Sequence, residues 1–197
     1  MPRPSRSFIA GCFTGIFLTI LFIVGVTLGG VYGFKSFWIQ QTAGKLKPPP
    51  ITTGLKADYA WKLIALDGTP YDFAQFQGKT VFLNFWNPDC LHCLAEIDTL
   101  NILYNTLQGS TVQIVGVVTE EEENLPETVQ NQEIHFPVYL FKGTLPEVFQ
   151  TTSRPATFII DPSGNIVFKH LGAAKWDDPS VVSFLAMLAH APVKNTN

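Results

Sequence analysis

The sequence predicts an α/β fold in which a central sheet of mixed strand direction is flanked by helices on both sides. Two almost wholly apolar runs, TVFLNFW at 80–86 and VQIVGVVT at 112–119, are typical of strands that are covered on both faces. The helical segment between them favours parallel pairing of the two strands. A strong turn signal at 161–164 joins two later strand-like runs and favours an antiparallel pair, which makes the sheet mixed.

The first part of the chain is predicted to lie outside this domain. After a short tail at 1–7, residues 8–34 form a run of 27 residues without Asp, Glu, Lys or Arg. As a helix this run reaches roughly 40 Å, which exceeds the hydrocarbon core of a bilayer. A cleaved signal peptide has an apolar centre of only about 7 to 15 residues. The run therefore favours an uncleaved membrane anchor, with a cleaved signal as the alternative.

The segment at 35–57 is predicted to be a linker, because its three successive prolines favour an extended and semi-rigid chain. Positive charges are nearly balanced on the two sides of the anchor, so the positive-inside rule scarcely decides its orientation. Beyond residue 34 the chain has 11 Lys and Arg against 16 Asp and Glu, and no basic stripe is visible. This charge pattern argues against nucleic-acid binding.

The domain itself is predicted at 58–192 and opens with a β-hairpin. The hairpin is expected from 61–66 and the Asp67-Gly68 turn, and a short helical piece around 72–77 should end at Gly78. The buried strand at 80–86 comes next, followed by a helix at 90–107.

The second half of the domain continues the alternation of strands and helices. The acidic run at 120–123 should start a helix, because negative charge suits a helix N-terminus. The remaining expected elements, before a short tail at 193–197, are a strand at 137–141, a helical turn at 145–151, strands at 156–161 and 166–172, and a closing helix at 181–189.

Cys90 and Cys93 are separated by two residues and lie where the first turn of the predicted helix follows the buried strand. The dipole and the unpaired N–H groups of a helix N-terminus favour an anion, so we expect the pKa of Cys90 to be lowered. A thiolate is the attacking species in disulfide exchange, and a second thiol one turn further in can release a mixed disulfide. The spacing therefore predicts Cys90 as the nucleophile and Cys93 as the resolving thiol.

Other uses of the cysteine pair fit less well. A structural zinc site needs two further ligands at similar spacing, but the histidines outside the pair stand alone. Covalent haem attachment needs a histidine directly after the second cysteine, where this chain has Leu94. A purely structural disulfide rarely spans so short a loop. We therefore expect neither a metal nor haem.

Several motifs taken together resemble the TlpA/ResA/cytochrome c maturation group of membrane-anchored thioredoxin-like proteins. They are GKTVFLNFW at 78–86, NFWNPDCLHC at 84–93, Glu96, and the Arg154-Pro155 step before a strand. The resemblance covers about residues 55–192. It implies a thioredoxin-like fold with an N-terminal hairpin extension. It also implies a thiol-disulfide oxidoreductase whose redox group is the Cys90–Cys93 disulfide, with no further cofactor.

The resemblance assigns three residues to substrate binding. In the family a cis proline faces the cysteine pair, and Pro155 occupies the matching position. A cis X-Pro bond exposes the preceding backbone, so the backbone of Arg154 is expected to pair with a client strand. The charge of Arg154 could also stabilise the Cys90 thiolate or attract acidic clients. Trp86, at the end of the buried strand, is the third residue. For Arg154 and Pro155, the alternative is that residues 153–155 are no more than the ordinary start of a strand.

Glu96 and Asn84 are the polar residues expected to manage protons. The family uses an acidic residue as proton carrier to the buried sulfur, and Glu96 matches it on the helical face of Cys93. A buried carboxyl with a raised pKa could take and return the Cys93 proton, although an exposed helix residue is the alternative. Asn84 interrupts an apolar strand where thioredoxins proper carry a buried aspartate, and we expect it to tune the pKa of its neighbours.

His92 and Asp89 leave the direction of electron flow open. A histidine before the second cysteine is typical of strongly oxidising DsbA-like proteins, in which a cation near the thiolate stabilises the reduced form. Asp89 should oppose this effect by repelling the thiolate. An ordinary exposed helix residue is an equally good interpretation of His92.

These features predict an oxidoreductase anchored in the inner (cytoplasmic) membrane, with its catalytic domain on the periplasmic or extracytoplasmic side. The expected clients are proteins with thiols or disulfides, and the resemblance favours apocytochrome c. A reductant in an oxidising compartment must be recharged, so a membrane electron donor such as a DsbD/CcdA-like protein is the expected partner.

Three other functions stay open. The first is a DsbA-like oxidase or isomerase, and the second is a non-catalytic thioredoxin-fold module that holds clients or metal. The third is the peroxiredoxin class, which shares the fold but uses a lone cysteine in a Thr/Ser-x-x-Cys setting, where Asn87 stands here.

Overall fold

The computed structural model describes residues 25–26, 54–119 and 124–191. The chain divides into two compact units, Met1–Thr42 and Ala43–Asn197. The predicted anchor at 8–34, except for residues 25–26, and most of the predicted linker thus lie outside the described residues. Within the part of the chain that is described, no helix is long and apolar enough to cross a bilayer.

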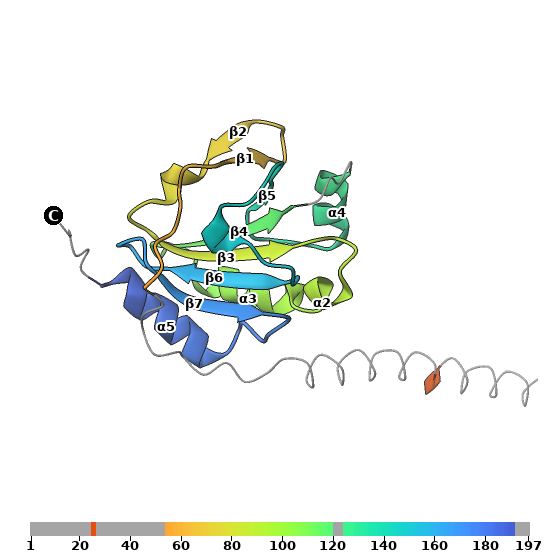
Figure 1. The fold of residues 1–197 in the computed structure, drawn as a ribbon. Helices are drawn as coiled ribbons and strands as arrows, with labels where there is room; N and C mark the ends of the chain where they lie inside the picture. The colour runs from red at the N-terminus through yellow and green to blue at the C-terminus, as the bar shows by residue number, and fades with distance from the viewer. Residues whose placement is uncertain (1–24, 27–53, 120–123, 192–197) are drawn as a thin grey trace, which may run out of the picture. The chain divides into compact units, whose positions relative to one another are not determined.

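The described residues of the second unit form one sheet of seven strands (Figure 1). Their order is β2 (Pro70–Asp72), β1 (Lys62–Ala65), β5 (Val138–Leu140), β4 (Val112–Val118), β3 (Thr80–Trp86), β6 (Ala156–Ile160) and β7 (Ile166–Leu171). The β3–β4 and β4–β5 pairs are parallel, and the other pairs are antiparallel. The predicted mixed sheet is confirmed, and β3 is an interior strand that is buried along its whole length because both of its faces are covered.

The N-terminal hairpin joins the sheet through its first strand. β1 pairs with β2 on one side and with β5 on the other, so the extension continues the sheet. The short helical piece is a 3-10 helix, η1 (Phe73–Phe76), whose first turn is capped by the Asp72 carboxylate accepting from the Ala74 N–H at 3.1 Å. Gly78 follows with a φ of +75°, a left-handed conformation that glycine adopts without strain.

The helices differ from prediction in one informative place. The expected continuous helix at 90–107 is two helices, α2 (Leu91–Leu94) and α3 (Ile97–Thr106). Between them the Glu96 N–H bonds to the Cys93 carbonyl, three residues back, at 3.2 Å. The other helical elements are α4 (Leu125–Asn131), η2 (Glu147–Phe149) and α5 (Pro179–Ala189). The acidic run at 120–123 lies outside the described residues, and α4 begins after it.

Helical elements cover both faces of the sheet, as predicted, but the three α-helices α3, α4 and α5 share one face and only 3-10 helices lie on the other. Core side chains of α3, α4 and α5 all belong to one buried cluster, together with Phe82 of β3. Successive steps from β3 to β4 to β5 run in the same direction, so right-handed crossovers put α3 and α4 on the same face. The opposite face is covered by η1, η2 and Trp61, whose aromatic side chains form the second cluster.

We call these two surfaces of the sheet the helical face and the aromatic face. Along β3, alternate side chains point to opposite faces, so Phe82, Asn84 and Trp86 share the helical face, whereas Phe85 lies on the aromatic face. The strand register continues the helical face across the sheet. Asn84 pairs with Thr157 of β6, and Thr157 pairs with His170 of β7, so these three side chains lie on the same face.

Candidate active site

Cys90 and Cys93 form a disulfide at the carboxyl end of β3. Their Cα atoms are 5.2 Å apart, and Cys90 is the N-cap of α2, with its sulfur accepting from the Cys93 N–H at 3.2 Å. The two sulfurs have different surroundings. Cys90 is half-buried, whereas Cys93 is only 1% exposed and belongs to the helical-face core. A client can therefore reach Cys90 before Cys93.

Asn87 fixes the loop that carries the disulfide. Its carbonyl accepts from the Cys90 N–H at 3.2 Å, and its side-chain Oδ1 accepts from the Thr119 N–H at 3.4 Å. Asn87 thereby ties the end of β3 to the end of β4. Sequence reasoning weighed this residue only against the peroxiredoxin motif and did not foresee this role.

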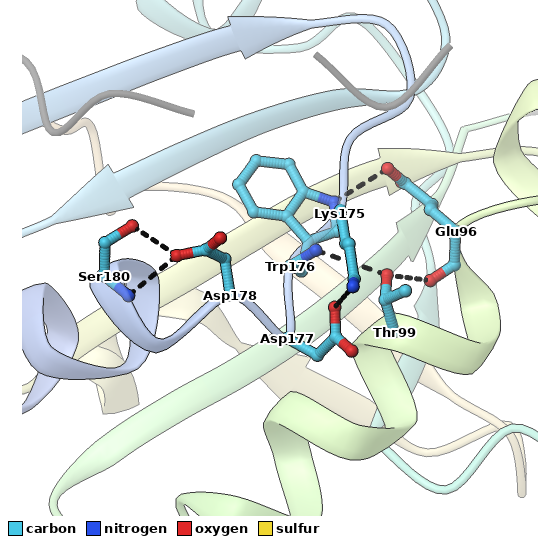
Figure 2. Close-up of polar contacts among 7 residues, drawn as sticks. All are labelled: Glu96, Thr99, Lys175, Trp176, Asp177, Asp178 and Ser180. Carbon is cyan, nitrogen blue, oxygen red and sulfur yellow. Dashed lines mark hydrogen bonds and ion pairs between the residues drawn. The ribbon is translucent and has the colours of Figure 1, made fainter. Parts of the chain in front are cut away.

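Glu96 is a buried carboxyl, as expected, with an exposed fraction of 1%. Its Oε2 accepts from the indole N–H of Trp176 at 2.7 Å and from the Ala174 N–H at 3.3 Å, and its Oε1 accepts from the Asn84 amide at 2.8 Å. Figure 2 shows the indole nitrogen of Trp176 directed at the carboxylate. Three N–H donors therefore surround one acid.

Burial raises the pKa of Glu96 to about 7, because the ionised form loses its hydration. The hydrogen bonds from Trp176, Asn84 and Ala174 act in the opposite direction, since each stabilises the carboxylate. A group balanced in this way exchanges protons near neutral pH. This is the range in which a general acid or base is most effective.

Asn84 joins Glu96 to the sheet. Its Nδ2 donates to Glu96 and, at 3.0 Å, to the Thr157 hydroxyl on β6. Its Oδ1 is buried and has no hydrogen-bond partner among the residues that the structure describes. Asn84 acts on the carboxylate as a donor only, which fits the ionised form of Glu96.

The Arg154-Pro155 peptide is cis, as the sequence comparison implied. Pro155 directly precedes β6, whose first residue, Ala156, pairs with Phe85 near the end of β3. The Arg154 guanidinium donates to the Thr119 hydroxyl and to the Ser153 carbonyl, both at 2.9 Å. These contacts hold the side chain against the end of β4.

The remaining predicted residues fall into two groups. Trp86 is 2% exposed and packs in the helical-face core, so the structure does not offer it to a client as the prediction required. Asp89 and His92 are exposed beside the disulfide. Neither side chain has a hydrogen bond or ion pair with another residue in the described ranges.

Sequence reasoning missed Trp176 and Thr99. The Thr99 hydroxyl donates to the Glu96 carbonyl at 2.9 Å and accepts from the Trp176 N–H at 3.3 Å. A tryptophan in the polar stretch before the closing helix was the available signal, because a buried indole N–H requires an acceptor. No group of three His, Cys, Asp or Glu side chains within the described residues could hold a metal ion.

Comparison with known proteins decides the family. The AhpC/TSA family pattern matches residues 56–169, which is more than half of the chain. The chain belongs to the AhpC/TSA family. Among its relatives, a thiol-disulfide oxidoreductase ResA of Bacillus cereus is 30% identical over 159 residues, covering 80% of this chain and 84% of the relative. ResA of Geobacillus kaustophilus is 27% identical and covers 78% of this chain and 82% of the relative.

Solved structures show what fold the chain shares with known proteins. The crystal structure of a putative thiol:disulfide interchange protein DsbE from Chlorobium tepidum has a TM-score of 0.59 at 20% identity, covering 68% of this chain and 98% of that one. A secreted Mycobacterium tuberculosis disulfide oxidoreductase homologous to E. coli DsbE has a TM-score of 0.56 at 23% identity, covering 66% and 100%. These likenesses show the thioredoxin-like fold.

The protein is therefore a thiol-disulfide oxidoreductase of the ResA type, with Cys90 and Cys93 as its C-x-x-C disulfide. The resemblance stated from the sequence motifs is confirmed. The lone-cysteine arrangement of the peroxiredoxin alternative does not fit, because Cys90 is paired with Cys93.

Proposed function

We propose that this enzyme is a membrane-anchored reductant that cleaves disulfides in client proteins outside the cytoplasm. The observation that carries the proposal is the unequal burial of the two sulfurs: Cys93 is buried and Cys90 is more accessible. The Glu96 carboxyl, with a pKa of about 7, is buried on the same face of the sheet as Cys93. An accessible sulfur suits attack on a client. A buried sulfur suits resolution, because it meets the mixed disulfide only from inside the protein.

The reaction begins with the enzyme reduced. The Cys90 thiolate attacks one sulfur of the client disulfide, a mixed disulfide forms, and the other client sulfur leaves as a thiolate. Cys93 then attacks the Cys90 sulfur, the second client sulfur leaves, and the Cys90–Cys93 disulfide is left behind. Two electrons pass to the client, which ends as a dithiol.

Glu96 is the proposed proton carrier for the second attack. Cys93 must lose its proton to become a nucleophile, and its buried position separates it from bulk water. Glu96 lies three residues further along the chain and is buried on the same face of the sheet as Cys93, so its carboxylate is the proposed acceptor of that proton. When the carboxyl later ionises, the proton passes to solvent or to a departing client thiolate.

The proposed setting follows from the sequence. Residues 8–34 anchor the chain in the inner membrane, 35–57 form the linker, and 58–192 carry the catalysis on the periplasmic or extracytoplasmic side, with tails at 1–7 and 193–197. Apocytochrome c is the proposed client. A DsbD/CcdA-like membrane protein is the proposed electron donor, since the oxidised enzyme must be recharged.

His92 favours one other function, that of a disulfide-introducing oxidase or isomerase. Its side chain is exposed between the two cysteines, where a cation would stabilise a Cys90 thiolate and thereby make the disulfide more oxidising.

The equilibrium reduction potential of the Cys90/Cys93 couple separates the two functions. It is measured on the full-length protein in graded thiol-disulfide buffers. A value near or below that of thioredoxin, about −270 mV, supports the reductant. A value near that of DsbA, about −120 mV, overturns it and makes His92 the decisive residue. A His92→Ala variant, measured beside the wild type, reports how much of the potential this side chain sets.

A further inference from the structure

The two oxygens of the Glu96 carboxylate are held differently. Oε2 accepts two N–H groups from a single loop, the indole of Trp176 and the backbone of Ala174, whereas Oε1 accepts only the Asn84 amide. A carboxylate oxygen has two lone pairs, so both are used at Oε2 and one stays open at Oε1. The open position for a proton is therefore at Oε1, on the side of β3.

Trp176 is fixed at both of its ends. Its ring is completely buried and packs edge-on against Phe82, with ring centroids 4.8 Å apart, and against His170 at 5.7 Å. Its backbone N–H donates to the Thr99 hydroxyl, which itself donates to the Glu96 carbonyl (Figure 2). The loop between β7 and α5 thus hydrogen-bonds directly to the Glu96 side chain and, through Thr99, to the Glu96 backbone.

We propose that Trp176 is a positioning residue for disulfide exchange: its indole N–H occupies Oε2 of Glu96, reserves Oε1 for the proton, and keeps the carboxyl acidic enough to release it. The inference rests on the proposed function, because it concerns the carrier of the Cys93 proton. Trp176 itself touches neither cysteine sulfur in this role. It acts through Glu96.

The charges around Glu96 do not provide another explanation for its proton affinity. The elements packed about it carry these titratable side chains: His92 and Cys93 on α2, Asp98 and Tyr104 on α3, Lys169 and His170 on β7, and Lys175, Asp177 and Asp178 in the loop. Lys175 and Asp177 pair with each other at 3.9 Å. Burial and the three N–H donors account for the pKa of Glu96, and Trp176 is the strongest of these donors.

The test is a Trp176→Phe variant, which keeps a buried aromatic ring and removes the N–H. The carboxyl carbon of Glu96 is followed by ¹³C NMR across the pH range in the oxidised, full-length protein. Loss of a donor to the carboxylate should move the Glu96 midpoint upward, by about tenfold in its acid dissociation constant for one buried hydrogen bond. An unchanged or lower midpoint overturns the inference.

Trp61→Phe is the matched control. Trp61 is also a buried tryptophan, on the aromatic face, and its indole N–H donates to the Asp58 carbonyl at 2.9 Å. This variant loses the same atoms and should leave the Glu96 midpoint where it is in the wild type. An equal shift in both variants would reduce Trp176 to a general packing residue and overturn the inference.

A second measurement needs no variant. In the wild type, the indole N–H resonance of Trp176 should titrate with the Glu96 midpoint, whereas that of Trp61 should not. Absence of this titration at Trp176 overturns the inference even if Trp176→Phe fails to fold. If Glu96 itself does not titrate between about pH 5 and 9, the proposed proton carrier falls as well, so the two failures are distinguishable.

Discussion

The helical face and the aromatic face of the sheet are both buried, but they hold different chemistry. The aromatic face is filled by Trp61, Phe73, Phe85, Phe149 and Phe158, with ring centroids 4.3 to 6.3 Å apart. The helical face also has a core of large apolar side chains, but it encloses Glu96, Asn84 and Thr157 beside Cys93. One sheet thus separates packing from proton handling.

This difference teaches how a small domain tolerates a buried acid. An unpaired carboxylate is costly to bury, and here three N–H donors from a loop, a strand and an indole offset part of that cost. The aromatic face needs no such donors. Its contribution is apolar burial, which stabilises the sheet that positions the acid.

The largest expected effect is at the cysteines. Cys90→Ser should reduce the rate of client disulfide reduction to background, because the other cysteine in the described residues, Cys93, is buried and cannot attack a client. Cys93→Ser should accumulate a covalent enzyme–client complex, visible as a reducible band on a gel, because the mixed disulfide cannot be resolved. Full turnover by either variant would contradict the assigned order of attack.

On the aromatic face, Phe149→Ala should cost about 3 to 5 kcal/mol of unfolding free energy, because it leaves a cavity under a fully buried ring. Urea unfolding measures this loss. The reduction potential of the folded variant should equal that of the wild type. A shifted potential would show that the two faces are not separate.

Glu96→Gln should flatten the pH dependence of stability. The folded protein holds a proton on Glu96 up to about pH 7, whereas the unfolded chain releases it near 4.5. Raising the pH through this window therefore favours the unfolded chain, by about 3 kcal/mol in total. Urea unfolding at several pH values should show the wild type losing this stability relative to Glu96→Gln. The exposed Glu127→Gln serves as control and should follow the wild type.

The smallest effect compares two buried threonines. Thr157→Val removes the acceptor of the Asn84 amide and should cost about 1 kcal/mol. Thr80 is also buried, but its hydroxyl has no hydrogen-bond partner among the described residues, so Thr80→Val should be nearly neutral. Thermal unfolding of the two variants measures the difference, and equal losses would mean that the Asn84–Thr157 bond adds nothing.

Local pattern predicted most of the fold. The strands β3 and β4, the hairpin and the closing helix were visible because apolar runs and turn residues are set by neighbours in sequence. The same holds for Cys90 and Cys93, whose spacing places them one helical turn apart, and for Glu96, which follows Cys93 by three residues. Trp86 could also have been placed correctly, because it alternates with Phe82 and Asn84 along a buried strand.

Other features depend on partners distant in sequence. Ala174 and Trp176 lie 78 and 80 residues after Glu96, and no spacing rule connects them. The break between α2 and α3 at Glu96 was missed in the same way, because the carboxyl there is held by that loop and by β3. The placement of the three α-helices on one face followed from the strand order, which could not be read from the sequence.

The reduction potential of the Cys90/Cys93 couple as a function of pH tests the central claim, that Glu96 manages the proton of Cys93. Reduction to two thiols takes up two protons with two electrons, a slope of about 59 mV per pH unit. A proton kept on the Glu96 carboxyl replaces the proton that a Cys93 thiolate has lost, so the wild-type slope should stay near this value to a higher pH than it does without the carboxyl. In Glu96→Gln the slope should therefore begin to flatten at a lower pH than in the wild type. Superimposable curves for the two proteins would contradict the account.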